Sequence, residues 1–131
     1  MKFLPLTFVA LLLVMFSAES ANASSNKSYR GFGACYAFNP DPDRRCYFGN
    51  GFGAAFIAKK QSNVRYTLCV TQKATGSKDC FRSRTRRKGR PSAVLLSNKS
   101  IVDDIGKYKL KWRVRGHGIV ARATLTMLLG D

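Results

Sequence analysis

Hydrophobic and polar residues alternate with a period of two along several short stretches of the chain. The clearest is "KYKLKWRVR" (107–115), where every second residue is apolar and the residues between are basic. This pattern predicts a strand with one buried and one exposed face. The expected buried side chains are Tyr108, Leu110, Trp112 and Val114, and the expected exposed ones are Lys109, Lys111, Arg113 and Arg115.

Two further stretches show the same alternation. In 63–71 the apolar set is Val64, Tyr66, Leu68 and Val70, and in 119–127 it is Ala121, Ala123, Leu125 and Met127. Arg65, Thr67 and Cys69 are then expected on the opposite face of the first strand, and Arg122, Thr124 and Thr126 on that of the second.

Turn-forming residues separate these strands from shorter ones. Apolar or aromatic runs at 31–38, 46–58 and 92–97 indicate further strands, and Asn50-Gly51 within the second is a strong hairpin signal. "NPDPDRR" (39–45) predicts a turn, because Pro40 and Pro42 cannot continue a ladder. The segment 100–106 is a connection with room for one helical turn. About seven or eight short strands with frequent turns predict an all-β sandwich or barrel.

The last quarter of the chain resembles a known type of module. "GKYKLKWRVRGHGIVARATLTM" (106–127) is similar to the closing hairpin of small secreted bacterial immunoglobulin-like domains, where a G-x-Y-x-x-x-W strand turns through glycine. The resemblance implies an immunoglobulin-like antiparallel sandwich of about seven strands, and a binding, adhesive or accessory role without catalytic residues. The immunoglobulin arrangement of an inter-sheet cysteine pair packed on tryptophan is not matched, because Trp112 follows all four cysteines.

The amino-terminal region predicts export. An apolar run over 3–16 has the length of a signal-peptide core, and Ala21-Asn22-Ala23 has the small residues of a cleavage site. We therefore expect a cleaved signal peptide over 1–23, a flexible lead-in over 24–30 and one β-sandwich domain over 31–131. We also expect a monomer with no membrane span after cleavage, because no later segment is long and apolar enough.

The four cysteines predict two disulfides, since an even count is typical of an oxidising compartment. Three pairings of Cys35, Cys46, Cys69 and Cys80 are possible. Turn formers lie within 36–45 and within 70–79, which favours two local cross-hairpin bridges, 35–46 and 69–80. Each would stabilise the fold by roughly 2–3 kcal/mol on the chain-entropy model. The wide spacing and the absence of paired histidines disfavour a metal site, and nothing indicates a cofactor.

Basic residues dominate the charge of the chain. It has 23 Lys and Arg against 7 Asp and Glu, a net charge of +16, and cleavage leaves this unchanged because it removes Lys2 and Glu19. The densest run is "RSRTRRKGR" (82–90), and Arg82, Arg84 and Arg86 share a face if the strand after Cys80 continues. The predicted ligand-binding residues are the basic members of this run and of the outward face of 109–115, namely Arg82, Arg84, Arg86, Arg87, Lys88, Arg90, Lys109, Lys111, Arg113 and Arg115.

If the two strips adjoin, they form a track for an anionic polymer or surface. Arginine binds phosphate and sulfate through a planar fork of donors, so a cell-wall polymer, an acidic glycan or nucleic acid would fit. The competing interpretation is that outward basic residues only keep the strands soluble and protect sheet edges from pairing. The sequence alone does not show whether the two strips adjoin.

The sequence argues against catalysis. His117 is the only histidine and lies between two glycines, which indicates a turn. The pairs Asp41/Asp43 and Asp103/Asp104 read as loop residues, and no glutamate follows the leader to act as a second acid. We expect a non-catalytic protein. Two alternatives are a partner or inhibitor module that displays Phe32 and Phe52 in loops, and a cationic antimicrobial or toxin-like protein.

Overall fold

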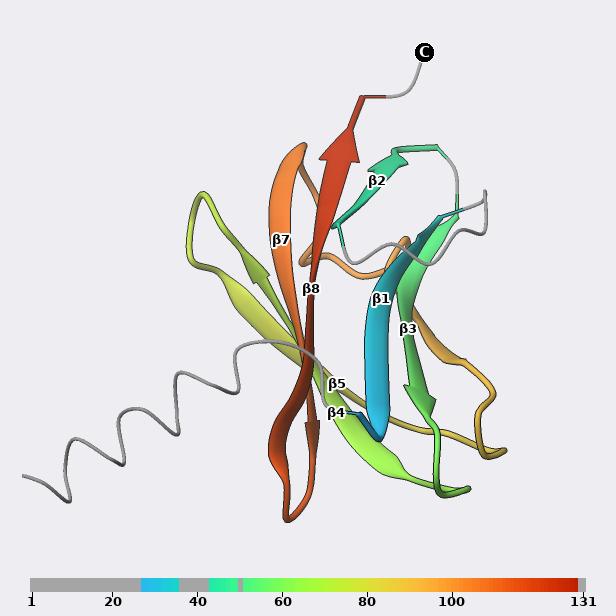
Figure 1. The fold of residues 1–131 in the computed structure, drawn as a ribbon. Helices are drawn as coiled ribbons and strands as arrows, with labels where there is room; N and C mark the ends of the chain where they lie inside the picture. The colour runs from blue at the N-terminus through green and yellow to red at the C-terminus, as the bar shows by residue number, and fades with distance from the viewer. Residues whose placement is uncertain (1–26, 36–42, 50, 130–131) are drawn as a thin grey trace, which may run out of the picture.

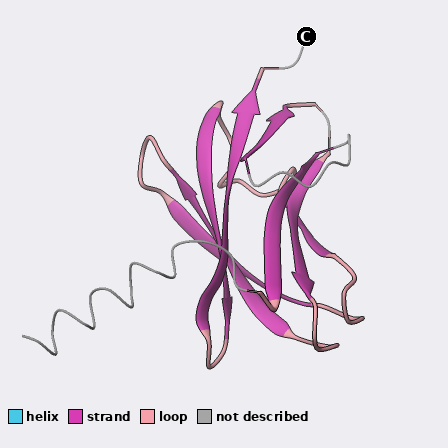
Figure 2. Cartoon of the chain, viewed as in Figure 1, coloured by secondary structure: helices cyan, strands magenta, loops and turns pink. Residues whose placement is uncertain are grey.

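The computed structural model describes residues 27–35, 43–49 and 51–129. These residues form eight strands and no helix (Figures 1 and 2). The strands are β1 (Tyr29–Cys35), β2 (Asp43–Tyr47), β3 (Phe52–Ala58), β4 (Arg65–Gln72), β5 (Lys78–Arg84), β6 (Ser92–Leu95), β7 (Gly106–Val114) and β8 (Gly118–Leu128). Accordingly, this part of the chain offers no helix of a length and apolarity that would cross a membrane.

The strands form two sheets that face each other. One sheet has the order β1-β3-β6 and is antiparallel throughout. The other has the order β2-β8-β7-β4-β5, in which β2 runs parallel to β8 and the remaining pairs are antiparallel. Figure 1 shows β1 and β3 on one side of the molecule and β4, β7 and β8 on the other. The prediction of an all-β protein is confirmed.

Alternation dictates how the five-stranded sheet faces the core. Every apolar position predicted for β7 is buried, and every basic position between them is exposed. The four apolar residues predicted to point inward from β4 are buried as well. The core therefore lies between the sheets, and the basic side chains of β7 face solvent on the far side.

Trp112 fills the centre of this core. Its ring stacks on Phe56 of the opposite sheet with centroids 6.3 Å apart, and Phe56 in turn contacts Tyr66 at 4.5 Å. Gly31 makes room for the indole, since a Cβ atom there would lie 2.4 Å from Trp112 Cε3. Within the described residues, the buried Trp112 Nε1 has no hydrogen-bond partner. Packing rather than polar contact therefore holds this side chain.

Tyr108 ties the segment before β7 to that strand. Its buried hydroxyl donates a hydrogen bond to the carbonyl oxygen of Asp104 at 2.7 Å and accepts one from the Asp104 N–H at 3.2 Å. Burial raises the pKa of the Tyr108 hydroxyl, and the backbone hydrogen bond at Asp104 offsets part of that rise. The neutral phenol is thus the form that the fold favours.

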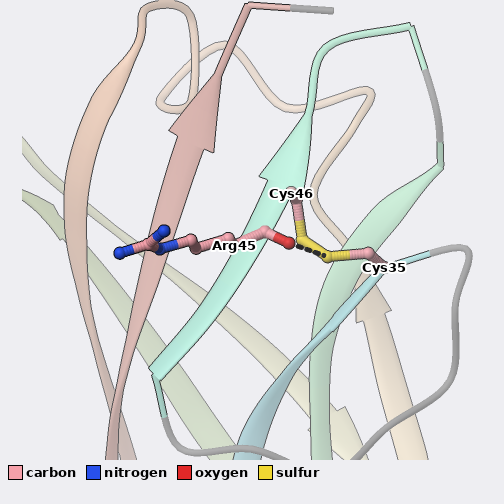
Figure 3. Close-up of a disulfide and its surroundings, with 3 residues drawn as sticks. All are labelled: Cys35, Arg45 and Cys46. Carbon is pink, nitrogen blue, oxygen red and sulfur yellow. Dashed lines mark hydrogen bonds between the residues drawn. A yellow bond between two sulfur atoms is a disulfide. The ribbon is translucent and has the colours of Figure 1, made fainter.

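Both predicted disulfides are present, in different settings. Cys69–Cys80 joins directly opposed residues of the β4–β5 hairpin, as predicted. Cys35–Cys46 has the predicted pairing but is no cross-hairpin bridge, because β1 and β2 belong to different sheets. It therefore staples the two sheets together (Figure 3). Cys35 Sγ also lies 3.0 Å from the carbonyl oxygen of Arg45, a contact in which the disulfide sulfur has no proton to donate.

Four local predictions need correction. The strands on either side of Asn50-Gly51 are β2 and β3, which lie in different sheets, so the hairpin prediction is wrong. The turn predicted over 39–45 gives way to β2 from Asp43, and 39–42 lie outside the described residues. β1 begins at Tyr29, within the predicted lead-in, and no helical turn occurs over 100–106. The predicted signal peptide also lies outside the described residues.

Candidate functional site

The outer side of the five-stranded sheet carries a continuous field of basic side chains, which we call the cationic face. Each of its members is exposed, and they come from all five strands: Arg45 from β2, Arg65 from β4, Lys78, Arg82 and Arg84 from β5, Lys107, Lys109, Lys111 and Arg113 from β7, and Arg122 from β8.

Strand β4 joins the two strips that the sequence predicted. It lies between β5 and β7, so residues directly opposed across it point to the same side of the sheet. Thr67 is opposite Arg82 on one side and Arg113 on the other, and Thr71 is opposite Lys78 and Lys109. Since neighbouring strands are about 4.8 Å apart, the two strips run about 10 Å from each other.

Residues that are directly opposed across neighbouring strands place further basic side chains between and beside these two strips. Arg65 is directly opposite Arg84, and Lys111 is directly opposite Arg122. On the far edge, Arg45 and Lys107 are both opposite Thr126 of β8. Arg122 interacts with another residue, and for the other members of the cationic face no ion pair is recorded within the described part of the chain. The register places one acidic residue in the same rows, because Asp43 of β2 is opposite Thr124, which is opposite Lys109.

The cationic face is larger than the sequence predicted. Arg45, Lys78 and Lys107 had no place in the predicted site, and Arg65 and Arg122 were expected to face outward but were not assigned to it. For Arg65, Lys107 and Arg122, the alternation with buried residues contained the signal. Using it required knowing that β4 and β8 border β7, and that is a property of the sheet order rather than of any one stretch.

The basic run 82–90 divides after Arg84, contrary to the expectation that Arg86 shares a face with Arg82. Strand β5 ends at Arg84, and Thr85 turns into the core, where its N–H donates to Val64 O at 2.8 Å and its Oγ1 accepts from Val64 N–H at 2.9 Å. The chain then leaves the sheet. Arg86, Arg87, Lys88 and Arg90 are exposed in the connection from β5 to β6.

That connection surrounds an open recess of about 350 Å³. Four arginines line it, Arg84, Arg86, Arg87 and Arg90, together with Pro91, Ser92 and Ala93. Arg84 belongs to both the recess and the cationic face. The predicted site is thus two adjacent surfaces, one formed by a sheet and one by a loop, while Arg115 is exposed just beyond the end of β7.

His117, Asp103 and Asp104 do not join either surface. His117 is exposed in the turn between β7 and β8, and the positive φ angles there belong to Gly116 and Gly118. Asp103 and Asp104 are exposed before β7, Asp43 begins β2, and Asp41 lies outside the described residues.

The aromatic side chains expected in the core are there. Tyr66, Tyr108 and Trp112 are buried, so they offer no stacking platform for bases. Phe32 and Phe52 are also buried, at 3% and 4% exposure, and therefore do not stand out as anchors for a protein partner. These five aromatic side chains therefore do not contribute to the two basic regions, whereas Tyr47 of β2 is exposed.

We compared the chain with known protein families, curated proteins and solved structures. No family model, no curated protein and no solved structure matches the chain.

Proposed function

We propose that the protein is a secreted, non-catalytic module that binds anionic polymers or surfaces through the cationic face. The observation that carries this proposal is the gathering of exposed basic residues from five strands on one side of one sheet. Charged residues generally point outward, but so many of one sign on one face repel each other. A bound polyanion relieves that repulsion and releases its own counterions.

The dimensions of the face favour a polymer over a small ion. Five strands at about 4.8 Å spacing give a width of about 19 Å, and residues two apart along a strand repeat at about 6.8 Å. A single small anion would contact two or three of these cations. A chain with charges at intervals of several ångströms would contact more of them in succession, for example Lys107, Lys109, Lys111 and Arg113 along β7.

We also propose an immunoglobulin-like topology and an extracellular location. The sheet order β1-β3-β6 corresponds to strands A, B and E of such domains, and β8-β7-β4-β5 corresponds to G, F, C and C′ of the variable type. The bond from Tyr108 to Asp104 resembles the tyrosine corner at the start of strand F. Two disulfides are consistent with an oxidising compartment.

The test is binding to heparin, duplex DNA, a teichoic-acid-like polymer, and anionic and neutral vesicles, each titrated across salt concentration. Three face lysines, Lys107, Lys109 and Lys111, are replaced by Gln. The matched control replaces Lys27, Lys59 and Lys60, which are exposed but lie off the face. On duplex DNA, losing three phosphate contacts should reduce the log–log salt slope by about 2.7.

The same experiment identifies the polymer class, because the ligand with the steepest slope is the one that meets the most cations. If the face variant and its control weaken binding equally for every ligand, then only the net charge of the protein matters and not the position of the lysines. In that case the proposal is wrong. Binding only to anionic vesicles would keep the face as the site but assign it to a membrane surface.

A further inference from the structure

The arginine-lined recess between β5 and β6 differs from the cationic face in its shape. The face is the side of a sheet, whereas the recess is an open hollow beside the loop that carries the chain from one sheet to the other. Its four arginines come from a segment of only seven residues, 84–90. None of the residues lining it is acidic. The recess is therefore a candidate for a separate anion-binding site rather than an extension of the cationic face.

Backbone hydrogen bonds hold the loop in place at several points. The Asn63 N–H donates to Arg86 O at 3.2 Å, and the Gly89 N–H donates to Ala58 O at 2.8 Å. Within the loop, the Arg90 N–H donates to Arg87 O at 3.2 Å. The arginine side chains therefore start from a fixed backbone, which lowers the entropy cost of placing them around a ligand.

The far wall of the recess is held in the same way. Ser92 Oγ donates to Arg84 O at 3.0 Å, which ties the start of β6 to the end of β5. The buried Tyr66 hydroxyl lies 3.0 Å from the same Oγ. Ser92 is thus occupied by structural bonds, and recognition of an anion falls to the four guanidinium groups.

We infer that the recess binds a phosphate monoester carried on a sugar-sized group, and that it anchors such a group of the polymer that lies on the cationic face. The inference rests on the proposed function. A guanidinium fork donates two parallel hydrogen bonds to one oxyanion, and several forks match the terminal oxygens of a monoester. A monoester carries a charge of about −1.5 to −2 at pH 7, which suits four arginines better than a singly charged sulfate or diester.

The size of the recess agrees with this ligand class. A volume of about 350 Å³ falls within the range of small-molecule sites and exceeds what a bare phosphate fills. Arg84, one of the residues that line the recess, also belongs to the cationic face. A polymer that places its phosphorylated group in the recess would therefore continue directly along the sheet.

The test compares two variants of equal charge. Arg87→Gln with Arg90→Gln alters the recess, and Arg82→Gln with Arg113→Gln alters the face. Arg84 stays in both because it belongs to both surfaces. The probes, titrated by calorimetry at pH 7.5, are glucose 6-phosphate, glucose 6-sulfate and dimethyl phosphate. We expect the recess variant to lose at least tenfold in affinity for glucose 6-phosphate, and the face variant to lose less than twofold.

Three outcomes would overturn the inference. They are no binding of glucose 6-phosphate by the unaltered protein, equal losses in the two variants, or sulfate and diester probes that bind as tightly as the monoester. None of these touches the polymer proposal, which depends on the salt slopes of the lysine variant. If the recess variant folds poorly, Arg87→Lys with Arg90→Lys keeps the charge but removes the forks. This lysine variant should still lose severalfold in affinity for glucose 6-phosphate. An unchanged affinity would contradict the proposal that the guanidinium forks bind the phosphate.

Discussion

The two sheets of the sandwich differ in what they place on each side. The five-stranded sheet points its largest side chains inward, among them Trp112 and Tyr108, and its basic side chains outward. The three-stranded sheet places small residues such as Gly31 and Ala54 against that bulk. On its other side, β1 and β3 carry Phe32, Ala34, Ala55 and Ile57, with Arg30 near one end.

Because of this difference, the residues that stabilise the fold are not the residues that carry the exposed positive charge. The core depends on the small residues of one sheet admitting the large residues of the other. The cationic face lies entirely on the far side of the larger sheet, away from that contact. Substitutions that disturb the fit between the sheets should therefore change the free energy of unfolding, and substitutions on the cationic face should change binding.

The largest effect on stability is expected from the bridge between the sheets. Replacing Cys35 and Cys46 by Ala removes a loop constraint worth about 3 kcal/mol and also part of the buried volume of Cys46, for a total of about 4 kcal/mol. Replacing Cys69 and Cys80 is the matched control, since both bridges span a sequence separation of 11 but this one lies on the outer side of one hairpin. It should cost about 3 kcal/mol.

Denaturant unfolding of both pairs measures this difference. A hairpin bridge that proves the more costly of the two would show that docking of the sheets does not limit stability. In that case the contrast between the sheets would be wrong as an account of what holds the fold together.

The next effect is expected at the contact between Gly31 and Trp112. Gly31→Ala would place a Cβ atom 2.4 Å from the indole ring, and the ring is buried and rigid. Overpacking of this kind should cost about 2–3 kcal/mol. Gly51→Ala, where an added Cβ meets nothing within 4 Å, is the control and should change the unfolding free energy by less than about 0.5 kcal/mol. Similar costs at the two glycines would contradict the proposed fit.

A smaller effect, dependent on pH, is expected at Tyr108. Tyr108→Phe removes the hydroxyl that bonds to Asp104 and should cost about 1–2 kcal/mol at neutral pH. The folded pKa of Tyr108 is raised, so the folded state holds the proton more tightly than the unfolded state. The stability that Tyr108 contributes is fully present below the unfolded pKa of about 10. It is lost as the pH rises from there through the higher pKa of the folded state.

The measurement is the unfolding free energy of both proteins between pH 8 and pH 11. The wild-type protein should lose its advantage over the variant at the alkaline end. A difference that is constant across this range would show that Tyr108 does not titrate differently in the folded state.

The smallest effect on stability is expected on the cationic face. Replacing Lys107, Lys109 and Lys111 by Gln removes exposed charges with no ion-pair partner among the described residues, so the unfolding free energy should change by less than about 0.5 kcal/mol per site. Relief of repulsion would make the sign stabilising. A loss of several kcal/mol would show that these side chains support the fold.

The sequence predicted the parts of this structure that depend on local alternation. Strands β4, β7 and β8 and most of their buried residues could be predicted in this way, but not the buried Val120, which lies beside the register shift at Trp112/Arg113. Both disulfide pairings follow instead from the turn formers between the cysteines. The arrangement of strands could not, because the Asn50-Gly51 signal indicates a turn but not which sheet each flanking strand joins. The extent of the cationic face and the division of the basic run at Thr85 depend on that arrangement, and so both became visible only in the fold.

The most direct test of the central claim is an NMR titration of backbone amides with a heparin-derived tetrasaccharide at low salt. The account predicts that shifts concentrate in β4, β5, β7 and β8, with smaller shifts at the arginine-lined recess and none in β1 and β3. Shifts confined to β1 and β3, or spread evenly over both sheets, would contradict the assignment of binding to the cationic face.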